Sequence, residues 1–449
     1  MKKTFLFIFF SYWIFFFLLP PFQAPDEQSH FDATYWIAKG IYPYVTYNVP
    51  TNQHPGERQQ ALFKDVILHD SIIPNFEKIK KSDVQRRRDY SISEKAQFAP
   101  IAGQAYNSPL YYFTAAGMLL LAQFLHANLL TQVYFVRFTS GLFYFGTVVA
   151  AYNICILLFK KKQIAQSFTL LFALNPLVLQ SSTSISPDIS PAFFAALFFF
   201  YIIKLNKNIL KIQSLILLGL IVGAACLARI TGIILIPGLA IYLYIQTKNV
   251  KKSIKSFLIF FLVVLSTQIP WFILNFIRYK TPVMAAPAFG APITNGHYLS
   301  PLSAVIVSMW GFRHTFMHYS GFLGFHDVYP FSPIFIAYTI LFIISFFIGI
   351  ISLWKSKIPF YRLAIVIVAI LFLLLFSLDI SRKILSHQNW ETGGKNALLI
   401  FLPMLLFSTQ GIAVIVRRKI EDIAPFLGYF SIWYYYFILI FVLIPRYYV

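Results

Sequence analysis

Apolar stretches of about 18 to 25 residues recur from one end of this 449-residue chain to the other. As a helix, each is long enough to cross the roughly 30 Å of hydrocarbon in a bilayer. The stretches are continuous rather than alternating, and in lipid only helices then satisfy the backbone polar groups. Charged residues make up 12% of the chain, against ~25% in a typical soluble domain. The sequence therefore predicts an all-α polytopic membrane protein.

These stretches predict about eleven transmembrane helices in a single membrane domain, residues 1–449. The apolar segments lie near residues 4–19, 109–126, 132–159, 163–181, 189–204, 212–228, 230–247, 256–277, 333–354, 361–379, 396–416 and 425–444. The topology requires an odd number of crossings between residues 109 and 160, but two apolar segments lie there. Eleven crossings are therefore expected from the twelve segments. Either 109–126 is a juxtamembrane or re-entrant helix, or the next segment is bent and counted wrongly, so twelve or thirteen spans stay open.

Basic clusters between the apolar runs set the predicted orientation, since cytoplasmic loops carry an excess of lysine and arginine. The clusters lie near residues 160–162, 204–211, 248–255, 355–357 and 417–419. They predict a multi-pass protein of the cell membrane with its N-terminus in the cytoplasm. Two long segments, 23–108 and 279–332, are then extracytoplasmic. Segment 23–108 holds ten acidic and ten basic residues, so the net charge of +21 comes entirely from the rest of the chain. The basic excess thus orients the protein, and no nucleic-acid partner is expected.

Candidate chemistry gathers on the predicted outer side, beginning directly after the first helix. Asp26 and Glu27 follow Pro25, and His30 comes one turn later. If a helix begins at Asp26, residues 26 and 30 share a face, which pairs a carboxylate with an imidazole. Such a pair suits a general base with an orienting partner, or the ligands of a divalent cation. The alternative is a helix N-cap, with Glu27 in the first turn.

Three further ionisable residues lie at predicted outer turns. Asp188 is a site candidate because an acid at the bilayer centre costs about 2.5–3.5 kcal/mol; the alternative is an N-cap of the following helix. Arg229 and Lys395 place cations where the inside bias predicts none, which suits a phosphate. For Arg229 the alternative is an arginine that snorkels at a helix end. Gly393 and Gly394 allow a ligand to approach the backbone beside Lys395.

The segment Ala24-Pro25-Asp26-Glu27-Gln28-Ser29-His30 resembles a Pro-Pro-Asp-Glu-x-x-His signature and differs from it at the first position. This signature belongs to a largely uncharacterised bacterial family assigned to the GT-C superfamily of membrane glycosyltransferases. Later segments resemble motifs of such enzymes in the same order: Asn107-Ser108-Pro109-Leu110-Tyr111-Tyr112, Ser186-Pro187-Asp188, Arg229-Ile230-Thr231-Gly232, Gly324-Phe325-His326-Asp327, and Gly394-Lys395-Asn396 as a reduced Gln-Gly-Arg-Tyr.

The resemblance implies a GT-C-like fold with a large extracytoplasmic first loop. It implies transfer of a sugar, with inversion, from a polyprenyl-phosphate-linked donor to a cell-surface or cell-wall glycan acceptor outside the cytoplasm. Asp26, as the base, and Glu27 would be the catalytic carboxylates. A divalent cation, Mg²⁺ or Mn²⁺, is left open as cofactor, and membrane lipids are the expected surroundings. The implied substrate-binding residues are His30, Asp188, Arg229, His326, Asp327 and Lys395.

Three other functions stay open. A transporter or flippase of lipid-linked oligosaccharides would place ionisable groups at mid-membrane depth on broken helices. The predicted spans are almost free of such groups, with Arg137 and Asp379 as partial exceptions near span ends. A polysaccharide polymerase would usually carry paired arginines in two outer loops. A non-catalytic assembly subunit could keep the fold without the chemistry.

Overall fold

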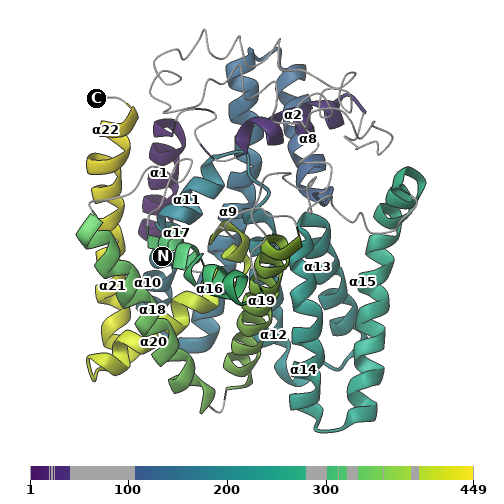
Figure 1. Ribbon diagram of the computed structural model, residues 1–449, viewed down its shortest axis with the longest axis vertical. Helices are drawn as coiled ribbons and strands as arrows, with labels where there is room; N and C mark the ends of the chain where they lie inside the picture. Colours follow the sequence, from purple (N-terminus) through teal and green to yellow (C-terminus); the bar gives the residue numbers. More distant parts are fainter. Residues whose placement is uncertain are drawn as a thin grey trace.

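The computed structural model describes residues 2–19, 21, 24, 26–40, 107–279, 301–311, 313–320, 332–356, 358–385 and 394–447. All regular secondary structure in these ranges is helical (Figure 1). The predicted outer segments 23–108 and 279–332 lie largely outside them. The elements are α1 (Lys2–Leu18), α2 (Glu27–Ala38), α8 (Leu110–Phe124), α9 (Leu129–Phe159), α10 (Lys162–Ala173), α11 (Pro176–Thr183), α12 (Ile189–Leu205), η1 (Asn206–Asn208), α13 (Ile212–Ala228), η2 (Ile230–Ile234), α14 (Leu235–Thr247), α15 (Val250–Tyr279), α16 (Pro301–Gly311), α17 (Arg313–Ser320), α18 (Ser332–Trp354), α19 (Pro359–Leu385), η3 (Gly394–Ile400), α20 (Phe401–Ile415), α21 (Ile420–Ile438), η4 (Leu439–Leu443) and α22 (Ile444–Tyr447).

The prediction of an all-α polytopic protein is confirmed. Within the described residues, seven helices are long and apolar enough to cross a membrane, and the bent pair α10–α11 makes up to eight. Each of the twelve apolar segments coincides with helix. However, α8, α12 and α13 have only 15 to 17 residues, and 17 residues of helix rise about 26 Å. The count of eleven spans therefore stays a prediction.

The region between residues 109 and 160, where the expected count was ambiguous, contains two helices of very different length. Helix α9 has 31 residues and extends about 46 Å, which exceeds the hydrocarbon thickness. Helix α8 has 15 residues, about 22 Å, and packs against α2 and α9 at the upper end of Figure 1. These lengths favour one crossing by α9 and a juxtamembrane α8.

The segment expected as one span at 163–181 is broken into α10 and α11, whose axes differ by 61°. The break falls at Asn175-Pro176. Proline has no N–H to donate to the preceding turn, and the Asn175 side chain begins the new helix by accepting a hydrogen bond from the Leu177 N–H at 3.1 Å. All eight residues of α11 are buried. A short helix is thereby held inside the protein.

Replacing Asn175 by alanine is expected to lower the free energy of unfolding by about 2 kcal/mol. The change removes the N-cap of α11 and the 2.8 Å bond from Asn175 Nδ2 to the Tyr319 carbonyl on α17. Thermal unfolding of the purified protein in detergent measures the loss. Asn153→Ala is the control, because Asn153 Nδ2 donates to Val149 at an exposed position of α9. Equal losses for the two variants would contradict the prediction.

The two ends of the helical bundle differ in charge. The turns from α14 to α15, from α18 to α19 and from α20 to α21 lie at the lower end of Figure 1. These turns carry the basic clusters at 248–255, 355–357 and 417–419. Helix α2, which follows Asp26, lies at the upper end. The acidic start of α2 and these basic turns therefore lie at opposite ends, as the predicted orientation requires.

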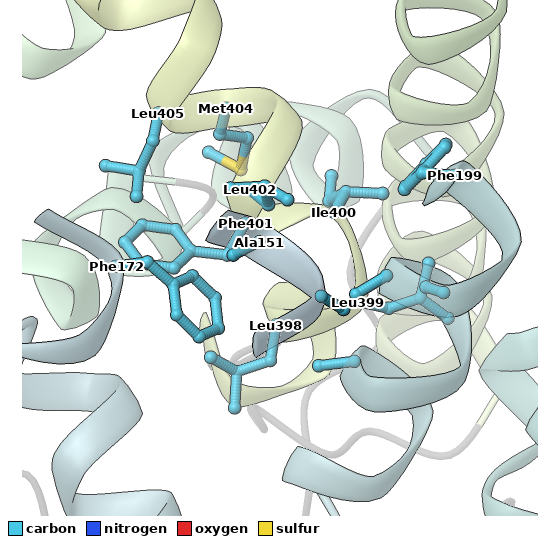
Figure 2. Packing of buried hydrophobic residues seen from close by; sticks show 14 of the residues in the cluster. Ala151, Phe172, Phe199, Leu398, Leu399, Ile400, Phe401, Leu402, Met404 and Leu405 are labelled. Carbon is cyan, nitrogen blue, oxygen red and sulfur yellow. The ribbon is translucent and has the colours of Figure 1, made fainter. Parts of the chain in front are cut away.

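The start of α20 lies deep in the protein core. Figure 2 shows the Phe401 ring beside Phe172 of α10, and the two ring centroids are 5.8 Å apart. The Phe401 ring stacks on the Tyr319 ring of α17 with centroids 4.4 Å apart. The span Ala397–Ile415 is 78% buried inside the protein, more than the other candidate spans in the described residues.

Helices α18 and α20 cross in direct backbone contact. A Cβ atom added at Gly411 of α20 would lie 1.7 Å from the Ser345 carbonyl oxygen of α18. A Cβ added at Gly349 of α18 would lie 1.8 Å from the Phe407 carbonyl oxygen of α20. Ser345 and Gly349, like Phe407 and Gly411, are four residues apart. The crossing therefore depends on small residues, as is common between membrane helices.

Candidate functional site

Five of the eight predicted site residues are described with their side chains, and they belong to three segments that the fold brings together. Asp26, Glu27 and His30 lie at the start of α2, Asp188 precedes α12, and Arg229 follows α13. His326, Asp327 and the side chain of Lys395 lie outside the described residues. The backbone of Lys395 belongs to η3, which packs against η2, the element directly after Arg229.

Glu27 forms a fully buried ion pair with Arg137 of α9. Arg137 Nε donates to Glu27 Oε1 at 2.7 Å and Nη2 donates to Oε2 at 2.9 Å, so the pairing is bidentate. Arg137 Nη1 donates to the Leu19 carbonyl at the end of α1 at 2.7 Å, and Glu27 Oε1 also accepts from the Ile185 N–H at 3.0 Å. Both side chains are 0% exposed. The pair joins α1, α2, α9 and the turn before α12.

Asp26 precedes this pair and is exposed. Its φ of 63° lies in the left-handed region, where aspartate, asparagine and glycine are tolerated best. The Asp26 carbonyl accepts from the His30 N–H at 3.0 Å and from Ser29 Oγ at 2.8 Å. An N-cap residue normally has an extended backbone, which Asp26 lacks. The backbone carbonyl of Asp26 thus begins α2 while its side chain lies at the surface.

Asp188 and Arg229 form an ion pair across the ends of α12 and α13. The Asp188 side chain is 2% exposed and that of Arg229 is 19% exposed. Ser186 Oγ donates to Asp188 Oδ2 at 2.9 Å, while Asp188 makes no side-chain capping bond to α12. Asp188 thus occupies the N-cap position of α12, but its carboxylate binds Ser186 and Arg229 instead of capping the helix. The Arg229 guanidinium pairs with this buried carboxylate, which the snorkelling alternative does not predict.

Arg229 lies in the electrostatic field of Asp26. Burial lowers the pKa of the Arg229 guanidinium, whereas the ionisable hydroxyl of Tyr112 and the carboxylate of Asp26 raise that pKa. Asp26 directly precedes Glu27, which binds the turn that carries Asp188, so the exposed carboxylate of Asp26 and the partly exposed cation of Arg229 belong to one network. A surface carboxylate that can accept a proton is therefore linked to a cation that can attract an anion.

His30 and Tyr112 connect α2 to α8. The Tyr112 hydroxyl is 2.7 Å from His30 Nδ1 and accepts from Asn107 Nδ2 at 3.1 Å. His30 is 5% exposed and Tyr112 is 0% exposed. The imidazole of His30 therefore contacts Tyr112 of α8. It joins the segment 24–30 to the segment 107–112, both of which carry motifs quoted above.

Ser140 of α9 holds the turn before Asp188 from the other side. Its Oγ forms a 2.8 Å bond with the Tyr111 hydroxyl of α8 and donates to the Ser186 carbonyl at 3.2 Å. The Ser186 N–H lies 3.3 Å from the same Oγ. The turn that carries Asp188 is thus fixed to α9 at two successive residues, Ile185 through Glu27 and Ser186 through Ser140.

Sequence reasoning missed the site roles of Arg137, Ser140, Tyr111 and Tyr112. Arg137 offered a signal, because an arginine inside an apolar helix is expected to have a buried partner. Tyr111 and Tyr112 belong to the motif at residues 107–112, but the sequence assigned no role to either side chain. Nothing in the sequence around Ser140 indicated a role. Within the described part of the chain, no group of three or more His, Cys, Asp or Glu side chains could hold a metal ion.

These features define a polytopic helical membrane protein with a network of ion pairs and hydrogen bonds at one end of its helices. Residues 7–385 match the family model described as "Predicted membrane protein (DUF2142)", and the chain belongs to this family. The match extends from residue 7, within α1, to the end of α19, and it includes Asp26, Glu27, His30, Asp188 and Arg229. No curated protein shows significant sequence similarity to the chain.

Proposed function

We propose that this protein is a membrane glycosyltransferase of the GT-C type. It transfers a sugar from a polyprenyl-phosphate-linked donor to a cell-surface or cell-wall glycan on the outer face of the cell membrane. One observation carries the proposal: at one end of the membrane helices, the exposed carboxylate of Asp26 directly precedes Glu27, which binds the turn that carries Asp188, and Asp188 pairs with the partly exposed cation Arg229. The opposite end carries basic turns, which supports an extracytoplasmic site.

In this proposal Asp26 is the general base. Its carboxylate accepts the proton of an acceptor hydroxyl while the hydroxyl oxygen bonds to the anomeric carbon of the sugar. The bond from that carbon to the lipid phosphate breaks on the opposite face, which inverts the configuration, and the electron pair leaves on the phosphate oxygen. Arg229 stabilises the charge that develops on the phosphate. Asp188, buried and bonded to Ser186, orients Arg229.

Two predicted roles are revised within this proposal. Glu27 is assigned a positioning role instead of a catalytic one, because its carboxylate is fully buried and both oxygens are bound to Arg137. His30 is assigned to the contact between α2 and α8, because its imidazole is buried against Tyr112. His326, Asp327 and Lys395 stay proposed substrate-binding residues, and a divalent cation stays an open cofactor.

Asp26→Asn is expected to lower the transfer rate by about 10²–10⁴-fold, the usual contribution of a general base. Asparagine suits this test because it tolerates the left-handed backbone of residue 26 and removes only the charge. The measurement is mass spectrometry of the surface glycan in a deletion strain complemented with either protein. Asp422→Asn is the control, because Asp422 is exposed at the start of α21 near a basic turn. A complete glycan with normally accumulated Asp26→Asn protein would refute the assignment.

A flippase of lipid-linked oligosaccharides is the second candidate. Two observations favour it: the broken pair α10–α11, and the buried charges of Glu27 and Arg137 beside the turn that follows α11. The two functions separate in the Asp26→Asn strain. A transferase defect leaves the sugar donor on the outer face of the membrane, whereas a flippase defect retains lipid-linked sugar on the cytoplasmic face. Glycan-specific probes applied to intact and to permeabilised cells distinguish these results.

A further inference from the structure

We infer that Arg137, acting through Glu27, is a positioning residue that couples the docking of α2 to the geometry of the Asp188–Arg229 pair. The exposed Asp26 and the buried Asp188 would then reach their working positions together. The catalytic consequence rests on the proposed function, whereas the coupling itself rests on the hydrogen-bond network alone.

The first step runs from α9 to the turn before α12. Arg137 binds both oxygens of Glu27, and Glu27 Oε1 accepts the Ile185 N–H at 3.0 Å. All three groups are buried. A buried N–H that loses its acceptor is costly, so the Ile185 backbone has a strong preference for the position that Glu27 defines. The position of Glu27 is defined in turn by Arg137.

The second step makes the turn rigid. Arg137 and Ser140 are three residues apart, so they lie on the same face of α9. Ser140 holds Ser186, the residue next to Ile185, through both the N–H and the carbonyl of Ser186. Ile185 and Ser186 are therefore both held to one face of α9. Ser186 is bound by Ser140 directly, whereas Ile185 is bound by way of Glu27 on α2.

The third step reaches the charged groups. Ser186 Oγ donates to Asp188 Oδ2, and Asp188 pairs with Arg229. On the other side, Asp26 is covalently adjacent to Glu27 and has a left-handed backbone, which rotation about Glu27 would disturb. A shift of α2 thus changes both Asp26 and the support of Asp188. Because thermodynamic coupling is reciprocal, a change in the turn must affect α2 by the same factor.

Hydrogen–deuterium exchange of the full-length protein in detergent tests the coupling in both directions. Glu27→Met/Arg137→Met removes both buried charges together, which avoids an unpaired ion, and is expected to raise exchange in residues 186–190 at least about fivefold. Ser186→Ala removes the bond to Asp188 and, by reciprocity, is expected to raise exchange in α2. Ser186 is linked to α2 by way of its neighbour Ile185, whose N–H donates to Glu27, and this second effect tests that link.

Tyr144→Phe is the matched control. Tyr144 is also fully buried on α9, four residues after Ser140, and its hydroxyl donates to the Ala173 carbonyl at 3.0 Å. This variant is expected to raise exchange near Ala173 and to leave α2 and residues 186–190 unchanged. Unchanged exchange in α2 for Ser186→Ala would overturn the coupling. Exchange that rises throughout the chain in all three variants would also overturn it, since the effect would then be global loosening.

A kinetic measurement tests the catalytic consequence with a short-chain polyprenyl-phosphate sugar as donor. For Glu27→Met/Arg137→Met we expect kcat to fall roughly 100-fold, as misplacement by about 1 Å can cause, with the KM for the donor unchanged. A normal kcat, or a loss confined to KM, overturns the positioning role. If the wild-type protein shows no transfer while exchange confirms the coupling, the proposed function fails and the coupling stands.

Discussion

Replacing Arg137 by glutamine is expected to lower the free energy of unfolding by about 3–5 kcal/mol. The change leaves the Glu27 carboxylate buried at 0% exposure without its bidentate partner, and removes the donor to the Leu19 carbonyl. Domains are usually stable by only about 5–15 kcal/mol. Most of the variant is therefore expected to be degraded, and fluorescence-detected size-exclusion chromatography of the detergent extract measures the amount that stays folded.

Two comparison variants make this result specific to the buried pair. Glu27→Gln/Arg137→Gln removes both charges and is expected to recover much of the lost stability, because no ion is left unpaired. Arg362→Gln changes an exposed arginine of α19 and is expected to change stability by less than about 0.5 kcal/mol. If Arg137→Gln is as stable as Arg362→Gln, the pair has no role in stability.

Gly411→Ala is expected to prevent normal packing of α18 against α20. The added Cβ would lie 1.7 Å from the Ser345 carbonyl oxygen, which belongs to a helix backbone and cannot rotate away. The two helices must separate, and the loss is expected to exceed the 1–3 kcal/mol typical of overpacking. Thermal unfolding in detergent, together with the accumulated amount of protein, measures this loss.

Gly117→Ala provides a control with the same chemical change. A Cβ at Gly117 in α8 meets no atom within 4 Å, and alanine is favoured over glycine in a helix by about 1 kcal/mol. The control should therefore be neutral or stabilising. Similar behaviour of the two alanine variants would show that the close approach of α18 and α20 does not constrain the fold.

The helices could be predicted from the sequence because lipid leaves the backbone little alternative to helix. The break within 163–181 was missed, although Asn175-Pro176 carries a capping residue followed by a proline that cannot continue a preceding helix. A hydropathy pattern averages over such a pair. The bend can be predicted only if the capping preference of Asn175 and the helix-breaking property of Pro176 are given more weight than the continuous hydropathy of the segment.

The site could be predicted in part, for a related reason. Asp26, Asp188 and Arg229 stood out because they do not belong to the basic clusters that set the predicted orientation, and the network through Glu27 and Ile185 links them. The partner of Glu27 could not be predicted, because Arg137 lies 110 residues away in sequence. A contact between residues so far apart in sequence leaves no periodic pattern from which it could be predicted. Both residues were noticed separately, but only packing of α2 against α9 pairs them.

The separation of Glu27 and Arg137 has a consequence for how the protein is made. Ribosomes add roughly 5–20 residues per second, so the 110 residues between the two take about 5–20 seconds to synthesise. Until α9 has been inserted, the Glu27 carboxylate has no cation to pair with and is best kept in water. Helix α2 would therefore be among the later elements to settle, although it is among the first to be translated. Insertion of the early helices can precede assembly of the site.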